Sequence, residues 1–363
     1  MSALEQAAAK MFGVGFGGMR FPDEMRRLIG RGVGGAILFR RNFENGEQFA
    51  DLCAELKRCA ERPFFTGIDH EGGRVVRLGL PFTAVPSMRT VGRDEAPETA
   101  RHMAEFIGRE LRAANIDMNF APVLDVDTNS GNPVIGDRSF GADPQRVAEM
   151  GAAWIGGLQS AGIAACGKHF PGHGDTTQDS HLDLPRLRHS LARLEEIELA
   201  PFAAAIRAGV AAIMTAHVVF EAIDPAVPAT ISRAVLTGLL RERLGFQGVI
   251  ISDDLEMKAI ANHFALREVI TRGVHAGVDL FLICHTPELQ NAAIDVVIER
   301  VERGDISREQ IDAAGRRIDL LFSKYVQPAQ PGTLSERLGR HAGPGMPGPV
   351  SGKNIRADPT SRD

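Results

Sequence analysis

The chain has 363 residues, of which 44% are hydrophobic and 24% are charged, and its formal net charge at pH 7 is -5. This composition is typical of a soluble globular protein, and the slight negative charge gives no electrostatic basis for binding nucleic acid or an anionic lipid surface. No apolar run is long enough to span a bilayer, and the first residues lack the basic and apolar regions of a signal peptide. We therefore expect a cytoplasmic protein with no nucleic-acid and no membrane partner.

The cysteines indicate a reducing environment and no metal centre. Cys53, Cys59, Cys166 and Cys284 form no CxxC pair and have no zinc-finger spacing to histidines. We expect four reduced thiols.

Short apolar runs alternate with longer amphipathic segments along most of the chain. Eight runs rich in Val, Ile and Phe indicate buried parallel strands, at 11–16, 36–39, 64–69, 118–125, 163–169, 211–218, 248–253 and 279–285. Helical patterns lie between them, at 48–60, 98–114, 144–160, 195–208, 233–244, 266–276 and 308–325. Glycine follows many of these helices, as expected at a helix C-cap.

This alternation predicts an α/β protein with a single-domain (β/α)8 barrel of the TIM type over residues 1–326. The alternative is a doubly wound open sheet, but no glycine-rich phosphate-binding fingerprint follows the first strand. Residues 327–363 are rich in Pro and Gly and poor in large apolar residues, so we expect a disordered tail there. A barrel gathers the carboxyl ends of all its strands at one mouth, where polar residues of this chain concentrate.

The loop after the fifth predicted strand holds the densest group of reactive side chains. It contains Lys168 and His169, and then Asp179 and His181 two positions apart. At that spacing in a loop the carboxylate can touch the imidazole, orient it and raise its pKa, which suits proton transfer near neutrality. The alternative is a loop held together by hydrogen bonds alone.

Asp253 and Asp254 end the seventh predicted strand. Successive strand residues point to opposite faces, so only one carboxylate can aim into the mouth. If Val249 and Ile251 face the barrel interior, so does Asp253, where it can serve as a nucleophile, a metal ligand or an ion-pair partner.

Three other strand ends carry polar residues with two interpretations each. Asp69 precedes two glycines and could hold sugar hydroxyls, or it could pair with Arg74 or Arg77. Arg138 could donate to a ligand through its planar fork, or it could pair with Asp137 or Asp125. His217 is more readily interpreted as a packed, hydrogen-bonded residue than as a ligand.

Several of these motifs together resemble a known family. The stretch Lys-His-Phe-Pro-Gly-His-Gly from Lys168, followed by Asp-Ser-His at 179–181, resembles the signature of glycoside hydrolase family 3 and, more narrowly, of the bacterial β-N-acetylhexosaminidases of the NagZ type. Supporting motifs occur in order at 69–74, 119–126, 137–140, 215–217 and 252–255. The resemblance spans about residues 10–325.

The resemblance implies residue roles at matching positions. Asp253 matches the nucleophile, and His181 matches the acid/base, assisted by Asp179. The residues that match those binding the non-reducing N-acetylglucosamine are Asp69, Arg77, Arg138, Lys168 and His169. His70 is a departure, because relatives usually carry Gln there.

The activity this resemblance implies is that of a retaining exo-β-N-acetylglucosaminidase (EC 3.2.1.52). The substrate would be a small carbohydrate, a muropeptide fragment of peptidoglycan recycling in which N-acetylglucosamine is linked β-1,4 to anhydro-N-acetylmuramic acid. Neither a metal nor an organic cofactor is required, and we expect a monomer.

Other functions remain compatible with the residues. A β-glucosidase or a β-glycoside phosphorylase could use the same scaffold, since a histidine acid repels phosphate less than a carboxylate would. A metal-dependent hydrolase could use His169, His181, His217 and Asp253 as ligands, although no His-x-His follows the first strand. A sugar-binding protein without catalysis is a further alternative.

Overall fold

The structure is a computed structural model that describes residues 2–178 and 183–341. Its centre is a closed barrel of eight parallel strands in the order β1-β10-β9-β7-β5-β4-β3-β2. The barrel strands are β1 (Phe12–Gly15), β2 (Gly35–Leu38), β3 (Phe65–Ile68), β4 (Met118–Asn119), β5 (Ala164–Phe170), β7 (Ala212–Thr215), β9 (Val249–Asp254) and β10 (Leu280–Ile283). The predicted (β/α)8 fold is confirmed, and each predicted strand contains or overlaps one of these eight.

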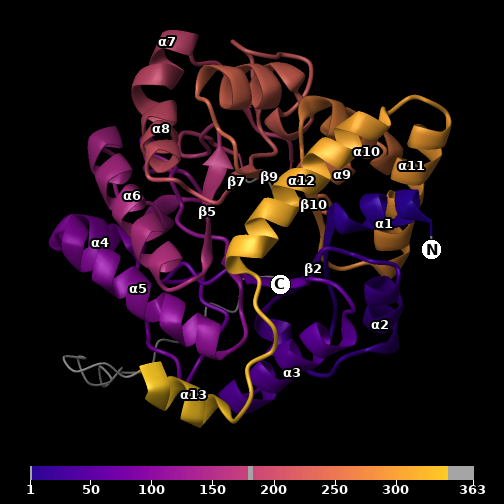
Figure 1. Ribbon diagram of the computed structural model, residues 1–363. Helices are drawn as coiled ribbons and strands as arrows, with labels where there is room; N and C mark the ends of the chain where they lie inside the picture. Colours follow the sequence, from indigo (N-terminus) through magenta and orange to yellow (C-terminus); the bar gives the residue numbers. More distant parts are fainter. Residues whose placement is uncertain (1, 179–182, 342–363) are drawn as a thin grey trace.

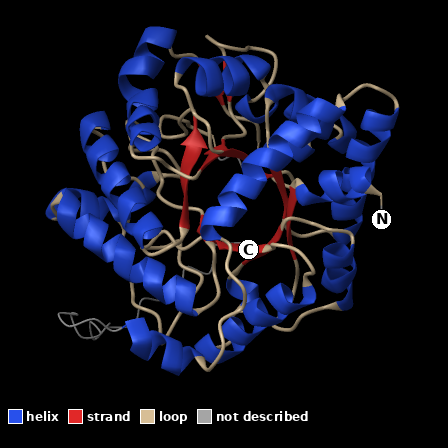
Figure 2. Ribbon diagram, in the orientation of Figure 1, coloured by secondary structure: helices blue, strands red, loops and turns tan. Residues whose placement is uncertain are grey.

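Helices surround the ring of strands, as Figures 1 and 2 show. The α-helices are α1 (Ala3–Lys10), α2 (Asp23–Gly30), α3 (Gly46–Cys59), α4 (Met88–Asp94), α5 (Pro97–Ala113), α6 (Pro144–Ser160), α7 (Leu191–Arg193), α8 (Leu199–Arg207), α9 (Lys258–Ala261), α10 (Leu266–Ala276), α11 (Pro287–Glu302), α12 (Arg308–Tyr325) and α13 (Leu334–His341). Shorter or irregular turns are η1 (Arg40–Asn42), η2 (Gly136–Arg138), η3 (Leu194–Glu198), η4 (Ala229–Ile231) and η5 (Ala234–Arg243). A small parallel sheet pairs β6 (Arg186–Leu187) with β8 (Val219–Phe220) beside the barrel.

Local sequence signals explain where several helices begin and end. Asn45 accepts a hydrogen bond from Gln48 N at the start of α3, and Ser307 forms a capping box with Gln310 at the start of α12. Gly277 ends α10 with φ of 107°, a left-handed conformation that glycine adopts without steric cost. These termini agree with the predicted ones to within two residues.

The amino ends of the strands are closed by α12, which lies across the ring of strands in Figure 2. Phe322 of α12 contacts Phe65, the first residue of β3, with ring centroids 5.9 Å apart. Arg317 of α12 donates to Asp279, which immediately precedes β10, at 3.0 Å. Because this end is sealed, the opposite, carboxyl end is left as the mouth of the barrel.

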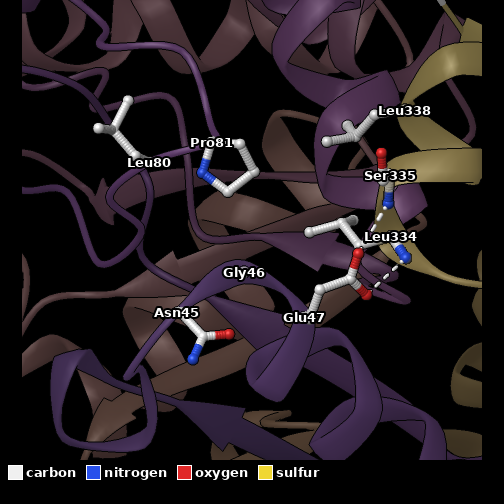
Figure 3. A pocket seen from close by; sticks show the side chains of 8 residues that line it. All are labelled: Asn45, Gly46, Glu47, Leu80, Pro81, Leu334, Ser335 and Leu338. Atoms are coloured by element: carbon white, nitrogen blue, oxygen red, sulfur yellow. Dashed lines mark hydrogen bonds between the residues drawn. The ribbon is translucent and has the colours of Figure 1, made fainter.

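The prediction of a disordered tail from residue 327 onward is wrong for residues 327–341. Leu334 is 1% exposed, and the carboxylate of Glu47 accepts hydrogen bonds from Leu334 N at 2.8 Å and Ser335 N at 2.9 Å. These contacts cap α13 against the start of α3 (Figure 3). The partner that stabilises this helix is more than 280 positions away, so the local composition gave no sign of it; residues 342–363 lie outside the described part of the chain.

Candidate active site

The mouth of the barrel gathers the predicted binding residues into one charged cluster. Lys168 Nζ lies 2.5 Å from Asp69 Oδ1 and 2.7 Å from Glu71 Oε1. Arg138 donates to both oxygens of Glu71 at 2.8 Å each, as a planar guanidinium fork. Two cations and two carboxylates are therefore interleaved, which leaves the cluster without net charge.

The neighbours of Lys168 and Glu71 shift the pKa of each group in the direction that keeps it charged. Burial by itself lowers the pKa of Lys168, but the carboxylates of Asp69 and Glu71 outweigh it and raise the pKa above its ordinary value. Burial likewise raises the pKa of Glu71, yet Arg138 and Lys168 together bring it well below its usual range. Lys168, Glu71 and Arg138 are therefore charged near neutral pH.

These pairings decide two of the alternatives left open by the sequence. Arg138 pairs with Glu71 and not with Asp137 or Asp125, while Asp137 is bonded to Arg74 at 2.9 Å. Asp69 pairs with Lys168 instead of a neighbouring arginine. The sequence motifs did not single out Glu71, although it stands within the motif at 69–74.

His169 is held from behind by a buried carboxylate. Its Nδ1 lies 2.7 Å from Asp125 Oδ2, and its Nε2 lies 3.5 Å from Arg138 Nη2. Asp125 is fully buried, and it also accepts from the backbone N–H of His173 at 2.7 Å. His169 thereby joins the Lys168 cluster on one side and a rigid anchor on the other.

An irregularity in β5 places Lys168 and His169 at the mouth. Gly167 pairs with Ile213, whereas Phe170 pairs with Thr215, so β5 carries one extra residue between these two points. A bulge of this kind bends a strand and re-aims its side chains, and such bulges are frequent beside active sites.

A second irregularity lies in β9, at the predicted nucleophile. Leu280 pairs with Ile251 and Leu282 with Asp254, so β9 also has one extra residue, and Ser252 Oγ accepts the backbone hydrogen bond of Leu282 at 3.0 Å. Simple alternation from Val249 therefore does not carry through to Asp253. The orientation of the two aspartates follows instead from their contacts.

Asp253 belongs to the electrostatic environment of the mouth. Burial raises its pKa, but electrostatic interactions with the nearby His169, His217 and Lys168 and a hydrogen bond from Asp254 N at 2.8 Å outweigh burial and lower it. Asp254 faces β10 instead, where its Oδ1 accepts from Cys284 N at 3.2 Å and its Oδ2 lies 3.3 Å from His285 Nε2. An ionised carboxylate at this position is suited to nucleophilic attack.

His217 has a structural role, as the sequence favoured. Its Nε2 lies 3.0 Å from the carbonyl oxygen of Asp254, and its Nδ1 lies 2.8 Å from the hydroxyl of Thr230. Because a carbonyl only accepts, Nε2 carries the hydrogen, and burial lowers the pKa of His217 so that the ring is neutral. Both ring nitrogens are engaged, so His217 is not free to bind a metal as the metal-dependent alternative requires.

Arg77 lies beside Phe39 and His70, which it influences electrostatically. Its Nε is buried without a hydrogen-bond partner in the described part of the chain, and the guanidinium lies 5.9 Å from the ring of Phe39. The neighbouring His70 has a buried Nδ1 that also lacks a partner there. Both atoms are therefore buried polar groups that the described residues leave unsatisfied.

The predicted acid/base His181 and its partner Asp179 lie outside the described residues. The described ends of their loop are fixed by polar contacts, since Asp175 Oδ2 is 2.5 Å from His189 Nε2 and Asp175 Oδ1 accepts from Thr128 at 2.7 Å. A Cβ at Gly174 would collide with the carbonyl of Val126, so only glycine permits this close approach.

Comparison with known proteins agrees with this geometry. Residues 4–321 match the family described as the glycosyl hydrolase family 3 N terminal domain. The chain belongs to glycosyl hydrolase family 3. The resemblance seen in its motifs and the prediction of a glycoside hydrolase are thus confirmed.

Individual relatives extend the match over most of the chain. It is 45% identical to the β-hexosaminidase of Thiobacillus denitrificans over 278 residues, which cover 75% of this chain and 77% of the relative. It is 43% identical to the β-hexosaminidase of Neisseria gonorrhoeae over 302 residues, or 81% of each chain. Among solved structures, a family 3 β-N-acetylglucosaminidase from Paenibacillus sp. has a TM-score of 0.86 at 43% identity, covering 99% of this chain and 66% of that one.

The described residues contain neither a membrane-spanning helix nor a cluster of metal-binding side chains. Within residues 2–178 and 183–341, no helix is both long enough and apolar enough to cross a membrane. Within the same residues, no three His, Cys, Asp or Glu side chains are grouped so that they could hold a metal ion.

Proposed function

We propose that the protein is a retaining exo-β-N-acetylglucosaminidase of the cytosol. Its substrate would be a muropeptide fragment, from which it removes the non-reducing N-acetylglucosamine during peptidoglycan recycling. The β-hexosaminidase names of the relatives support the reaction class. The observation that carries the proposal is the ionised Asp253 beside the Lys168 cluster at the open end of the barrel.

In the first step, Asp253 attacks the anomeric carbon while His181 protonates the glycosidic oxygen that leaves. The carbon–oxygen bond to the leaving group breaks, and an ester forms between the sugar and Asp253. In the second step, neutral His181 takes a proton from water, and the hydroxide displaces Asp253 with a second inversion. The released sugar therefore keeps the β configuration.

The charged cluster supplies the binding contacts. Asp69 accepts hydrogen bonds from sugar hydroxyls, while Lys168, Arg138 and Arg77 donate to sugar oxygens and His169 presents its Nε2. Because Lys168 and Arg138 are already paired with carboxylates, they are oriented before the ligand arrives, which lowers the entropy cost of binding.

A panel of aryl β-glycosides tests the proposal, with N-acetylglucosaminide, glucoside and xyloside compared under one condition. We expect the N-acetylglucosaminide to be hydrolysed fastest, with the β-anomer as the first product by NMR. Formation of the α-anomer would rule out the double displacement, and preference for the glucoside would indicate a β-glucosidase. Production of a sugar 1-phosphate when phosphate is added would indicate a phosphorylase.

The acid role of His181 has its own test. His181→Ala should keep fast cleavage of an aryl glycoside with a good leaving group and lose about 10²–10⁴-fold on the natural disaccharide. Equal losses on both substrates would contradict the role. Comparing the kcat/KM of the wild-type protein on a muropeptide disaccharide and on chitobiose would then test which aglycone it prefers.

A further inference from the structure

We propose that Asp125 is a positioning residue for the reaction, which fixes the orientation and the tautomer of the His169 ring at the mouth of the barrel. This inference rests on the proposed role of His169 in binding the sugar. It assigns a function to a buried carboxylate that takes no part in the bond-making steps.

The contacts of Asp125 all converge on one short segment. Besides the ring of His169, its oxygens accept the backbone N–H of His169 at 3.2 Å and that of His173 at 2.7 Å. Asp125 itself is 0% exposed, and it follows β4 on a different part of the barrel wall. One carboxylate therefore ties the backbone and a side chain of the β5 loop to the neighbouring strand.

This geometry decides which nitrogen of His169 carries the hydrogen. An ionised carboxylate only accepts hydrogen bonds, so the contact of 2.7 Å requires a proton on Nδ1. The opposite nitrogen, Nε2, then faces Arg138 and the mouth. Without Asp125, the ring could adopt either tautomer and could rotate away from the mouth.

The ionisation of Asp125 supports this assignment. Burial would raise the pKa of Asp125, but attraction to His169 and to His173 outweighs burial and lowers it. The ionised carboxylate can accept the hydrogen of Nδ1 but has none to donate, so the tautomer of His169 is fixed.

Other polar and charged groups surround Asp253 and His169, and replacing Asp125 does not remove them. Asp253 is also influenced by His217 and Lys168 and by Asp254 N, while His169 is flanked by Arg138 and by the ring of His173 at 5.8 Å. Replacing Asp125 by Asn leaves these groups in place but exchanges one acceptor oxygen for an NH₂ donor, so the hydrogen bonds from His169 N, His169 Nδ1 and His173 N can no longer all be accepted. The expected result is a higher KM with a smaller change in kcat, because a misplaced His169 ring weakens binding of the sugar.

A double-mutant cycle on aryl N-acetyl-β-glucosaminide hydrolysis tests the proposal. Asp125→Asn should lower kcat/KM by about 10- to 100-fold, the loss typical when a carboxylate that orients a functional histidine is removed. In the His169→Gln background the same change should have less than about a threefold effect, because Asp125 then has no ring to position. Two losses that simply multiply, with an unchanged KM, would mean that Asp125 only supports the fold.

Asp127→Asn is the matched control. Asp127 lies two positions away on the same segment but pairs with Arg89 instead of a histidine. This variant should weaken stability without raising KM. An equal rise of KM in Asp127→Asn would overturn the proposal, because it would show a general effect of charge in this segment.

A measurement on the unmodified protein covers the case in which Asp125→Asn does not fold. In ¹⁵N-histidine-labelled protein, with the signal of His169 identified by its absence in His169→Gln, Nδ1 should carry a proton throughout the active pH range. A ring protonated on Nε2 alone would overturn the inference. If instead Nδ1 is protonated and the cycle is non-additive but the first product of hydrolysis is the α-anomer, then the proposed retaining reaction fails while the role of Asp125 stands.

Discussion

Two buried lysines lie at opposite ends of the barrel and differ in what surrounds them. Lys57, near the amino ends of the strands, bonds to Asp117 and to the carbonyl of Gln327, but Arg112 shares the same carboxylate. Burial lowers the pKa of Lys57, and its single shared carboxylate does not offset this. Lys168, between two carboxylates at the mouth, has a raised pKa.

The difference shows how each end uses its buried charge. At the amino end, the chain itself completes the bonding, as at Asp279, where Arg241, Arg317 and Ile250 N donate to the two oxygens. At the carboxyl end, within the described residues, the only hydrogen-bond donor to the carboxylate of Asp253 is Asp254 N. The first arrangement stabilises the fold, while the second leaves bonding capacity for a ligand.

The largest effect expected at the mouth comes from Asp253→Asn. Activity should fall about 10⁴-fold or more, because the amide cannot form the glycosyl ester. Since the carboxylate is incompletely bonded, the free energy of unfolding should stay the same or rise. Steady-state kinetics and urea unfolding measure the two effects. A larger loss of activity in Asp254→Asn than in Asp253→Asn would show that Asp254, and not Asp253, is the nucleophile.

The opposite pattern is expected at the amino end for Asp279→Ala. The change leaves the partly buried Arg241 and Arg317 without their buried carboxylate, and the free energy of unfolding should fall by about 3–5 kcal/mol. The kcat of the folded enzyme should not change, because Asp279 lies at the far end of the barrel. Asp295→Ala, which removes an exposed pair with Arg31, should cost no more than about 1 kcal/mol in the same urea titration.

A matched pair of lysine variants compares the two ends directly. Lys168→Met removes a donor to the sugar and unbalances Asp69 and Glu71, so kcat/KM should fall by about 10²–10³-fold. Lys57→Met should lower stability and leave kcat/KM within about a factor of two, since no ligand reaches it. Loss of activity in the folded Lys57→Met protein would show that the two ends are coupled.

The strand pattern and the loop motifs sufficed to predict the barrel and most of the charged cluster. Alternating apolar runs report burial directly, and a barrel necessarily brings the carboxyl ends together. Polar residues that follow different strands, such as Asp69 and Lys168, are therefore expected to be neighbours although about a hundred positions separate them along the chain.

The remaining features depend on contacts between distant segments. Glu71 and Asp125 are identified as supporting carboxylates only by the partners they meet across the barrel. The bulge in β9 inserts one residue between Ile251 and Asp254, and no pattern in the sequence indicates where such an insertion falls. The docking of α13 depends on Glu47, and a groove of about 400 Å³ remains between Leu80 and Leu338 (Figure 3).

The last comparison concerns the pH dependence of stability, which originates at the mouth. Burial is the main cause that lowers the pKa of His70 and of His173 to about 4 in the folded protein, against an unfolded value of 6.5. Between these values the unfolded chain binds protons that the folded chain does not, so stability falls as the pH drops from about 6.5 to about 4. Each histidine accounts for roughly 3 kcal/mol across that range, as an upper estimate.

Urea titrations at several pH values measure this loss, and calorimetry in buffers of different ionisation enthalpy counts the protons taken up on unfolding. His70→Gln should flatten the pH dependence by about half, because one of the two buried rings is removed. His102→Gln, at a side chain that is 61% exposed, should leave the dependence as it is. A steep acid loss that persists in a His70→Gln/His173→Gln variant would place its source among the carboxylates of the mouth, such as Glu71 and Asp125, whose lowered pKa values would act at lower pH.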